Sequence, residues 1–143
     1  MSLATESYTC RWTDQLITID GKGDEAAWGK AELIDSFAVS WLQGSERRSP
    51  RTRTRARLLW DRDYLYFLAD MEDGDLFADI VNHDGKTWLN DVFELFFKPS
   101  GQHEGYYEFQ VNAAGTMMDM FIPQRTRTMF LDHVDKGDFH LAT

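Results

Sequence analysis

The sequence contains little cysteine and proline and no long apolar run. Its single cysteine, Cys10, excludes a disulfide bond within the chain. Three prolines and a hydrophobic content of 43% argue against a disordered chain. No apolar run approaches the roughly 20 residues that a membrane-spanning helix requires. These features indicate a folded chain outside the membrane, and 143 residues suffice for a single domain over 1–143 with its own core.

The formal net charge of −9 argues against nucleic-acid binding, which depends on Lys and Arg side chains that neutralise phosphates. One segment departs from this average, because six arginines lie close together: Arg47, Arg48, Arg51, Arg53, Arg55 and Arg57. From Arg51 onward they occupy every second position, so a strand would place them on one face. We favour an exposed strand paired with acidic neighbours over an anion-binding row of arginines.

Alternation of apolar and polar residues with a period of two is the dominant pattern and predicts strands. The expected strands cover 15–20, 36–42, 56–61, 64–69, 91–98, 105–112 and 116–122. A short helical turn is expected over 24–28, with Asp24 as its cap and Trp28 facing the core, and a second short helix over 76–81. The fold class predicted is therefore all-β, an antiparallel β-sandwich of jelly-roll or immunoglobulin-like type.

A polar patch with an aromatic neighbour is the candidate binding site. In strands 91–98 and 105–112, alternation places Glu94, Gln110 and Asn112 on the outer face, opposite an apolar face. Trp88 precedes the first of these strands, in a loop from which its indole would overhang the patch. An aromatic ring covers the apolar face of a sugar, and carboxylate and amide groups bind its hydroxyls. A solvated strand surface explains the same pattern, so the alternation alone leaves both interpretations open.

Two groups of motifs resemble family 9 carbohydrate-binding modules. The first is Ile19-Asp20-Gly21 with Asp24-Glu25-x-x-Trp28, followed by Arg57-Leu58-Leu59-Trp60-Asp61-x-x-Tyr64-Leu65-Tyr66-Phe67. The second is Trp88-x-x-Asp91-x-x-Glu94, followed by Tyr107-x-Phe109-x-Val111-Asn112-x-x-Gly115-Thr116. The resemblance implies a non-catalytic β-sandwich that holds carbohydrate chain ends and is attached to enzymes that degrade polysaccharides such as xylan or cellulose. It also implies a secreted, periplasmic or cell-surface protein, although the sequence shows no leader.

Carried over by position, the resemblance assigns Trp88 to sugar stacking, Glu94 to the hydroxyls and Asn112 to an amide contact. At Gln110 well-studied members have an arginine, so this contact is altered. The family's second sugar-clamping ring comes from a region beyond the end of this chain, which stops within a strand-like pattern. The chain is thus a fragment, a shortened relative, or one that completes its sheet with a partner. Trp12, Trp41 and Trp60 are the candidates for a replacement ring, although Trp60 is expected in the core.

Four alternatives remain beside this interpretation. A structural or interaction module that has lost sugar binding is the strongest. Glu94 and Glu108 as the acid and base of a glycosidase would need a closed cleft, so we expect no catalytic residues. A b-type haem domain would use a methionine such as Met117, Met118 or Met120, although methionine in a strand is more often core. Structural calcium fits the many acidic loops, with no ligands assigned, and an open sheet edge would allow a homodimer.

Overall fold

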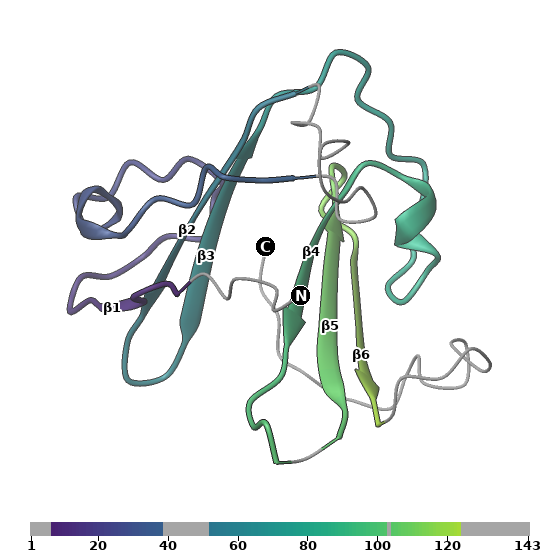
Figure 1. Cartoon of the computed structure of the whole chain (residues 1–143). Coiled ribbons are helices and arrows are strands. Elements are labelled where there is room, and N and C mark those ends of the chain that lie inside the picture. The colour runs from purple at the N-terminus through teal and green to yellow at the C-terminus, as the bar shows by residue number, and fades with distance from the viewer. Residues whose placement is uncertain (1–6, 39–51, 103, 124–143) are drawn as a thin grey trace. The chain divides into compact units, whose positions relative to one another are not determined.

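A computed structural model describes residues 7–38, 52–102 and 104–123 of the chain. The chain divides into two compact units, Met1–Asp73 and Gly74–Thr143, and each contains one three-stranded sheet (Figure 1). In the described residues, the helical structure consists of short 3-10 turns, among them η1 (Trp28–Lys30) and η3 (Thr87–Leu89). No helix in these described segments is long and apolar enough to cross a membrane. The predicted all-β class with two sheets is confirmed.

The first sheet has the order β1-β2-β3, formed by Arg11–Trp12, Thr54–Trp60 and Leu65–Met71. Strands β2 and β3 form the predicted antiparallel hairpin, whereas the two-residue β1 pairs with β2 in parallel. The hairpin turn is fastened by Asp61, whose Oδ1 accepts the backbone N–H groups of Asp63 (2.8 Å) and Tyr64 (2.7 Å). This side chain satisfies turn donors that would otherwise face water, as Asp commonly does in tight turns.

The core of the first unit contains Ile17, Ala27, Trp28 and Leu59. Trp28 lies at the start of η1 and is buried, as predicted. The expected cap Asp24 makes no such bond. Glu25 instead accepts the Trp28 indole N–H (3.0 Å) and the Thr18 backbone N–H (2.7 Å). These bonds hold segment 15–20 as irregular chain against the core, so the strand predicted there is wrong.

The second sheet is the regular antiparallel meander β4-β5-β6, formed by Val92–Phe97, Tyr106–Asn112 and Met117–Ile122. All three strands were predicted within one or two residues. The turn between β5 and β6 requires a positive φ of 79° at Gly115, which only glycine adopts without strain. Met118, Met120 and Ile122 form the buried cluster of this unit, with Trp88 and Tyr106 packed against it.

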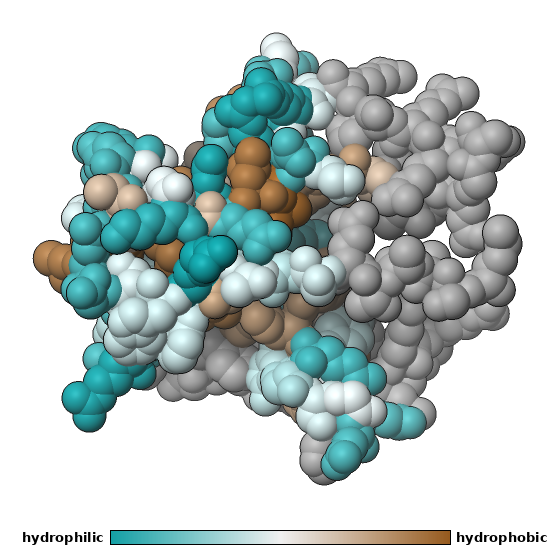
Figure 2. Space-filling model, turned by 60° about the vertical axis from the view of Figure 1, so that its left-hand side comes forward, coloured by the Kyte–Doolittle hydropathy of each residue, from teal (hydrophilic) through white to brown (hydrophobic). Residues whose placement is uncertain are grey.

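Three other predictions concern segments 36–42, 47–57 and 76–81. Residues 76–81 form irregular chain and not the short helix expected there. The described part of 36–42 contains no strand, and its remainder lies outside the described residues, as do Arg47, Arg48, Arg51 and Trp41. Arg55 lies opposite Asp70 in the register of β2 and β3, which agrees with a strand paired with acidic neighbours. Figure 2 shows one face on which hydrophilic residues predominate, with hydrophobic residues in smaller areas between them.

Candidate functional site

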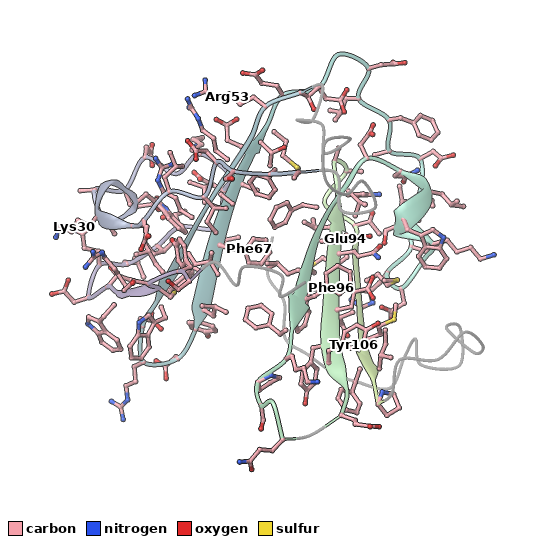
Figure 3. The ribbon with its side chains drawn as sticks, in the orientation of Figure 1. Lys30, Arg53, Phe67, Glu94, Phe96 and Tyr106 are labelled. Carbon is pink, nitrogen blue, oxygen red and sulfur yellow. The ribbon has the colours of Figure 1, made fainter. Side chains whose placement is uncertain are left out.

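One face of the second sheet brings the predicted polar residues together. The strand register pairs Glu94 of β4 with Gln110 of β5, and Gln110 with Met118 of β6. The next row on the same face consists of Phe96, Glu108 and Met120. Residues directly opposite each other in neighbouring strands share a face, so these two rows form one continuous surface. Figure 3 shows Glu94 and Phe96 on β4 beside Tyr106 of β5.

Trp88 lies on this same face, as the sequence predicted. It belongs to the 3-10 turn η3, is half-buried, and packs against the cluster of Met118, Met120 and Ile122. This cluster continues the two rows into β6. The indole is therefore held beside the polar residues by its packing against the sheet.

Most of the polar face is buried, which corrects the expectation of an outer, solvated surface. Glu108, Gln110 and Asn112 are 5%, 2% and 4% exposed, respectively, whereas Glu94 is exposed. The segment before β4 covers these strands, because Thr87 in η3 is fully buried and donates its hydroxyl to Gln110 Oε1 at 2.7 Å. Alternation within strands identified the face but gave no indication that a loop covers it.

A chain of hydrogen bonds joins Thr87, Gln110 and Glu108. Gln110 accepts from Thr87 and donates from Nε2 to Glu108 Oε1 at 2.7 Å. Both amide ends of Gln110 therefore have protein partners, which fixes the orientation of the amide. Sequence reasoning did not include Thr87 or Glu108 among the binding residues. The alternation in β5 already placed Glu108 on this face, whereas nothing in the sequence singled out Thr87.

Asn112 is fully engaged with the backbone and with one side chain. Its Nδ2 donates to the Ile80 carbonyl (2.8 Å) and to Asn90 Oδ1 (3.1 Å). Its Oδ1 accepts the N–H groups of Ala114 (3.0 Å) and Thr116 (2.8 Å). A side-chain amide offers two donors and two acceptor sites, so Asn112 has no remaining hydrogen-bonding capacity. It fastens the covering segment and the β5–β6 turn to the sheet.

The carboxyl groups of this face are harder to ionise than ordinary glutamates. Loss of contact with water raises the pKa of Glu108, and the nearby charge of Glu94 raises it further, against the opposing effect of the Gln110 hydrogen bond. Neighbouring side chains also shield the Glu94 carboxyl from water and raise its pKa. For Glu108 the cause is its burial within the sheet, which removes water from the carboxyl.

A potential metal-ligating group lies at the edge of β6. His83, Asp84 and Asp119 each offer one ligand atom, and these atoms lie within 4.8 Å of one another. Asp84 also pairs with the strand, because its N–H donates to the Met117 carbonyl (3.0 Å) and its Oδ1 accepts the Asp119 N–H (3.3 Å). Calcium takes oxygen ligands, whereas this group includes an imidazole. These contacts attach the turn at Asp84 to strand β6, and structural calcium stays a prediction.

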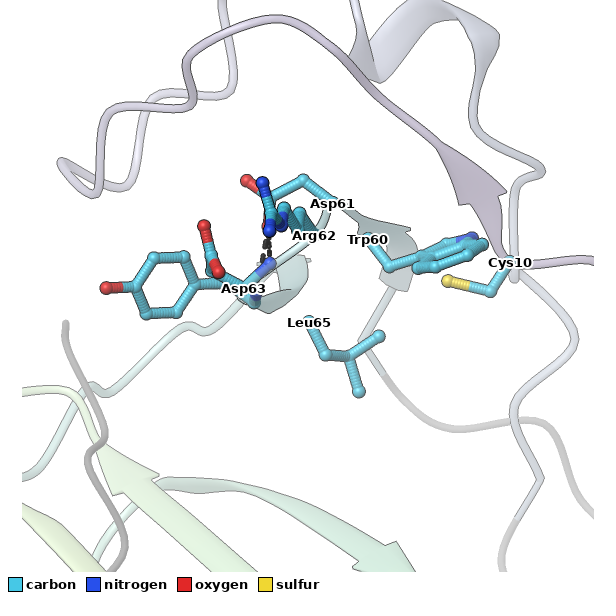
Figure 4. Close-up of a pocket in the computed structure, with 7 residues that line it drawn as sticks. Cys10, Trp60, Asp61, Arg62, Asp63 and Leu65 are labelled. Atoms are coloured by element: carbon cyan, nitrogen blue, oxygen red, sulfur yellow. Dashed lines mark hydrogen bonds between the residues drawn. The ribbon is translucent and has the colours of Figure 1, made fainter.

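A pocket of about 510 Å³ lies at the hairpin end of the first unit (Figure 4). It is lined by Cys10, Trp60, Leu65 and the turn residues 61–64. Trp60 is 44% exposed and meets Trp12 edge-on at 4.8 Å, so its predicted core position is wrong. The adjacent Leu59, 1% exposed, occupies the core instead. Asp61 cannot bind a ligand freely, because both its oxygens already accept hydrogen bonds within the hairpin.

Comparison of the sequence with known protein families identifies the family of this chain. Residues 19–119 match the sequence pattern of the family described as "Carbohydrate family 9 binding domain-like". The chain belongs to this family. The resemblance predicted from the motifs is thus confirmed, and with it the coarse function of a non-catalytic carbohydrate-binding module.

Curated relatives agree with this assignment. The chain is 35% identical over 100 residues to an endo-1,4-beta-xylanase A of Thermotoga maritima, with 66% of this chain and 8% of the relative covered. It is 33% identical over 90 residues to the exoglucanase XynX of Acetivibrio thermocellus, with 63% and 7% covered. An endo-1,4-beta-xylanase A of Thermoanaerobacterium saccharolyticum gives the same identity over 90 residues. The chain thus spans less than a tenth of these relatives, and no solved structure matches it.

Proposed function

We propose that this family 9 module binds a sugar on the covered face of the second sheet, against Trp88 and Glu94. The observation that carries the proposal is the strand register, which places Glu94, Gln110 and the cluster under Trp88 on one face. The half-buried indole supplies an apolar plane for the C–H face of a pyranose. The exposed Glu94 carboxylate supplies two acceptor oxygens for neighbouring hydroxyl groups.

The buried amides have supporting roles in this proposal. Gln110 is held between Thr87 and Glu108, and Asn112 has four partners in the chain. Neither is arranged to exchange its bonds for sugar hydroxyls without loss, because buried polar groups are costly to leave unpaired. Their role is to fix the turn that carries Trp88. This differs from the direct sugar contacts that the resemblance implied for both residues.

The polymer recognised and the cellular location follow from the relatives only by analogy. Their names describe xylanases and an exoglucanase, so xylan and cellulose chain ends are the ligands to test first. Such polymers lie outside cells, which supports a secreted or surface location.

Calorimetric titration tests the proposal. Xylose, glucose, xylobiose and cellobiose are added to the native protein and to the variants Trp88→Ala and Trp88→Phe. We expect saturable heat with the native protein, loss of at least tenfold in affinity with Trp88→Ala, and partial recovery with Trp88→Phe, because phenylalanine keeps an apolar ring. Absence of heat from every sugar up to millimolar concentration would overturn the proposal.

A second candidate is a structural module that has kept the fold and lost sugar binding. The observation in its favour is that the amides expected to contact sugar are used inside the protein. The same titration separates the two, because a purely structural module gives no saturable heat. The b-type haem alternative has less support, because Met118 and Met120 are fully buried core residues.

A further inference from the structure

Exposed aromatic side chains gather at the hairpin end of the first sheet. Trp12, Trp60 and Tyr64 are 53%, 44% and 63% exposed, and Leu65 beside them is 44% exposed. Contiguous large apolar side chains at a protein surface commonly mark a recognition site. Trp60, Tyr64 and Leu65 all line the pocket of about 510 Å³ at this end of the unit, which has the size of ordinary small-molecule sites.

The apolar wall of this pocket is held in place by the chain around it. Trp60 and Leu65 lie opposite each other in the register of β2 and β3, so their side chains share one face of the sheet. The edge-on contact with Trp12 at 4.8 Å and the bond from the Thr13 N–H to the Trp60 carbonyl (2.8 Å) fix the position of Trp60. Asp61 fixes the turn through three hydrogen bonds that it accepts. A preformed site loses little conformational entropy when a ligand binds.

Polar groups at the turn are free to bind a ligand. The Arg62 guanidinium, the Asp63 carboxylate and the Tyr64 hydroxyl belong to exposed residues, and none of the three groups makes a hydrogen bond or ion pair within the described segments. Figure 4 shows Arg62 and Asp63 at the turn, away from Cys10. The guanidinium donates hydrogen bonds, the carboxylate accepts them, and the hydroxyl does both. Because the charges of Arg62 and Asp63 have opposite signs, they favour a neutral ligand with several hydroxyl groups.

Cys10 forms part of the pocket wall and is the single cysteine of the chain. Burial raises the pKa of its thiol, so the thiol is uncharged at neutral pH and adds to the apolar surface. A ligand in the pocket would cover this thiol. Its chemical reactivity therefore reports whether the pocket is occupied.

We propose that this pocket is a second sugar-binding site of the module, which holds one neutral pyranose against Trp60 and Tyr64. The two rings supply apolar surface for the C–H face of the sugar, and the charged groups of Arg62 and Asp63 bind its hydroxyls. The carbohydrate-binding family of the chain gives the class of ligand. The inference rests on the proposed function, because it extends sugar binding from the second unit to the first.

Alkylation of Cys10 tests the proposal at the pocket itself. Iodoacetamide reacts with the thiolate, so the native protein is treated at mildly alkaline pH, and the modified fraction is followed by mass spectrometry. Xylobiose and cellobiose are the sugars added. Only the protein without bound sugar reacts, so at a sugar concentration about ten times Kd the rate should fall about tenfold.

Two results of this experiment would overturn the proposal. The first is an alkylation rate that neither sugar lowers, even at the highest soluble concentration. The second is a thiol that does not react in the absence of sugar, because a pocket closed to iodoacetamide is also closed to a larger pyranose.

Substitutions of Tyr64 assign the protection to this pocket. Tyr64→Ala removes the exposed ring and should raise the sugar concentration for half protection about tenfold, equivalent to about 1.4 kcal/mol. Tyr64→Phe keeps the ring and loses the hydroxyl, so the concentration should rise only about threefold. Phe77→Ala removes a similarly exposed ring outside the pocket and should leave the protection unchanged. Thermal unfolding checks that each variant is folded, and unchanged protection in Tyr64→Ala would contradict the assignment.

Trp88→Ala separates the two sugar sites. Cys10 should stay protected in this variant while calorimetric binding weakens, because the pocket lies in the other unit. Loss of the protection in Trp88→Ala would overturn the second site, since the protection would then arise from binding at Trp88. If Cys10 is protected and Trp88→Ala binds sugar as tightly as the native protein, the pocket stands and the site at Trp88 falls.

Discussion

The Thr87 hydroxyl donates to Gln110 Oε1 at 2.7 Å, and both residues are almost completely buried. This bond attaches η3 to β5. Trp88 is the next residue after Thr87, so the position of its ring on the sheet depends on this attachment. The ring proposed to stack on sugar is therefore attached to the sheet through a contact between a loop hydroxyl and a strand amide.

Removal of the Thr87 hydroxyl should weaken both stability and sugar binding. Thr87→Val keeps the shape and leaves the Gln110 carbonyl oxygen buried without its partner, which costs about 1 to 3 kcal/mol. The free energy of unfolding from denaturant titration measures the first effect, and calorimetry with cellobiose the second. Thr87→Ser retains the hydroxyl and is the control. Equal sugar affinity in Thr87→Val and the native protein would contradict the positioning role.

Asn112 should behave as a structural residue. Asn112→Ala removes four hydrogen bonds and should lower the free energy of unfolding by about 2 to 4 kcal/mol, at roughly 1 kcal/mol for each bond net. Asn112→Asp keeps the bonds to Ala114 and Thr116 but sets a buried carboxylate oxygen against two acceptors, the Ile80 carbonyl and Asn90 Oδ1, so its loss should be at least as large. A variant that loses sugar affinity at unchanged stability would instead support the direct contact implied by the family resemblance.

The charge on Glu108 should reduce stability at neutral pH. Burial raises the pKa of Glu108 above the ordinary value of 4.5, so the native protein keeps this proton to higher pH than the unfolded chain. The stability associated with the proton is complete below that ordinary value and is lost as pH rises through the folded pKa. Glu108→Gln should therefore raise the melting temperature by about 2 to 4 °C at neutral pH. The gain should vanish in acid.

Melting curves at several pH values check this prediction, with Glu104→Gln as the charge-matched control at an exposed position. A gain that persists unchanged in acid would show that the substitution stabilises by packing and not through ionisation. Loss of stability at neutral pH would contradict the prediction outright.

The second sheet was predicted almost completely because its strands alternate without interruption and are separated by turns with Gly and Asn. The same alternation correctly placed Glu94 and Gln110 on one face. It could not show that Gln110 is buried, because burial depends on the 3-10 turn η3 folding over the strand. That turn is set by Thr87, whose partner lies 23 residues further along the chain.

In the first unit, prediction from local pattern was less successful. Segment 15–20 alternates as a strand does, yet Glu25 binds the Thr18 N–H and holds the segment as irregular chain. Trp60 shares its strand face with Leu58 and was placed in the core, whereas its position at the end of β2 leaves it exposed. Both errors have the same cause. Contacts between segments determine the conformation and burial of these residues, and local alternation does not report such contacts.

Sugar binding on the second sheet beside Trp88 is the proposal on which the others depend. The most direct test is a two-dimensional ¹H–¹⁵N NMR titration with cellobiose, in which each of the five tryptophans gives its own indole signal. We expect the largest shifts at the Trp88 indole and at the amides of Glu94 and Gln110. Shifts confined to Trp12 and Trp60, or no shifts at saturating sugar, would contradict it.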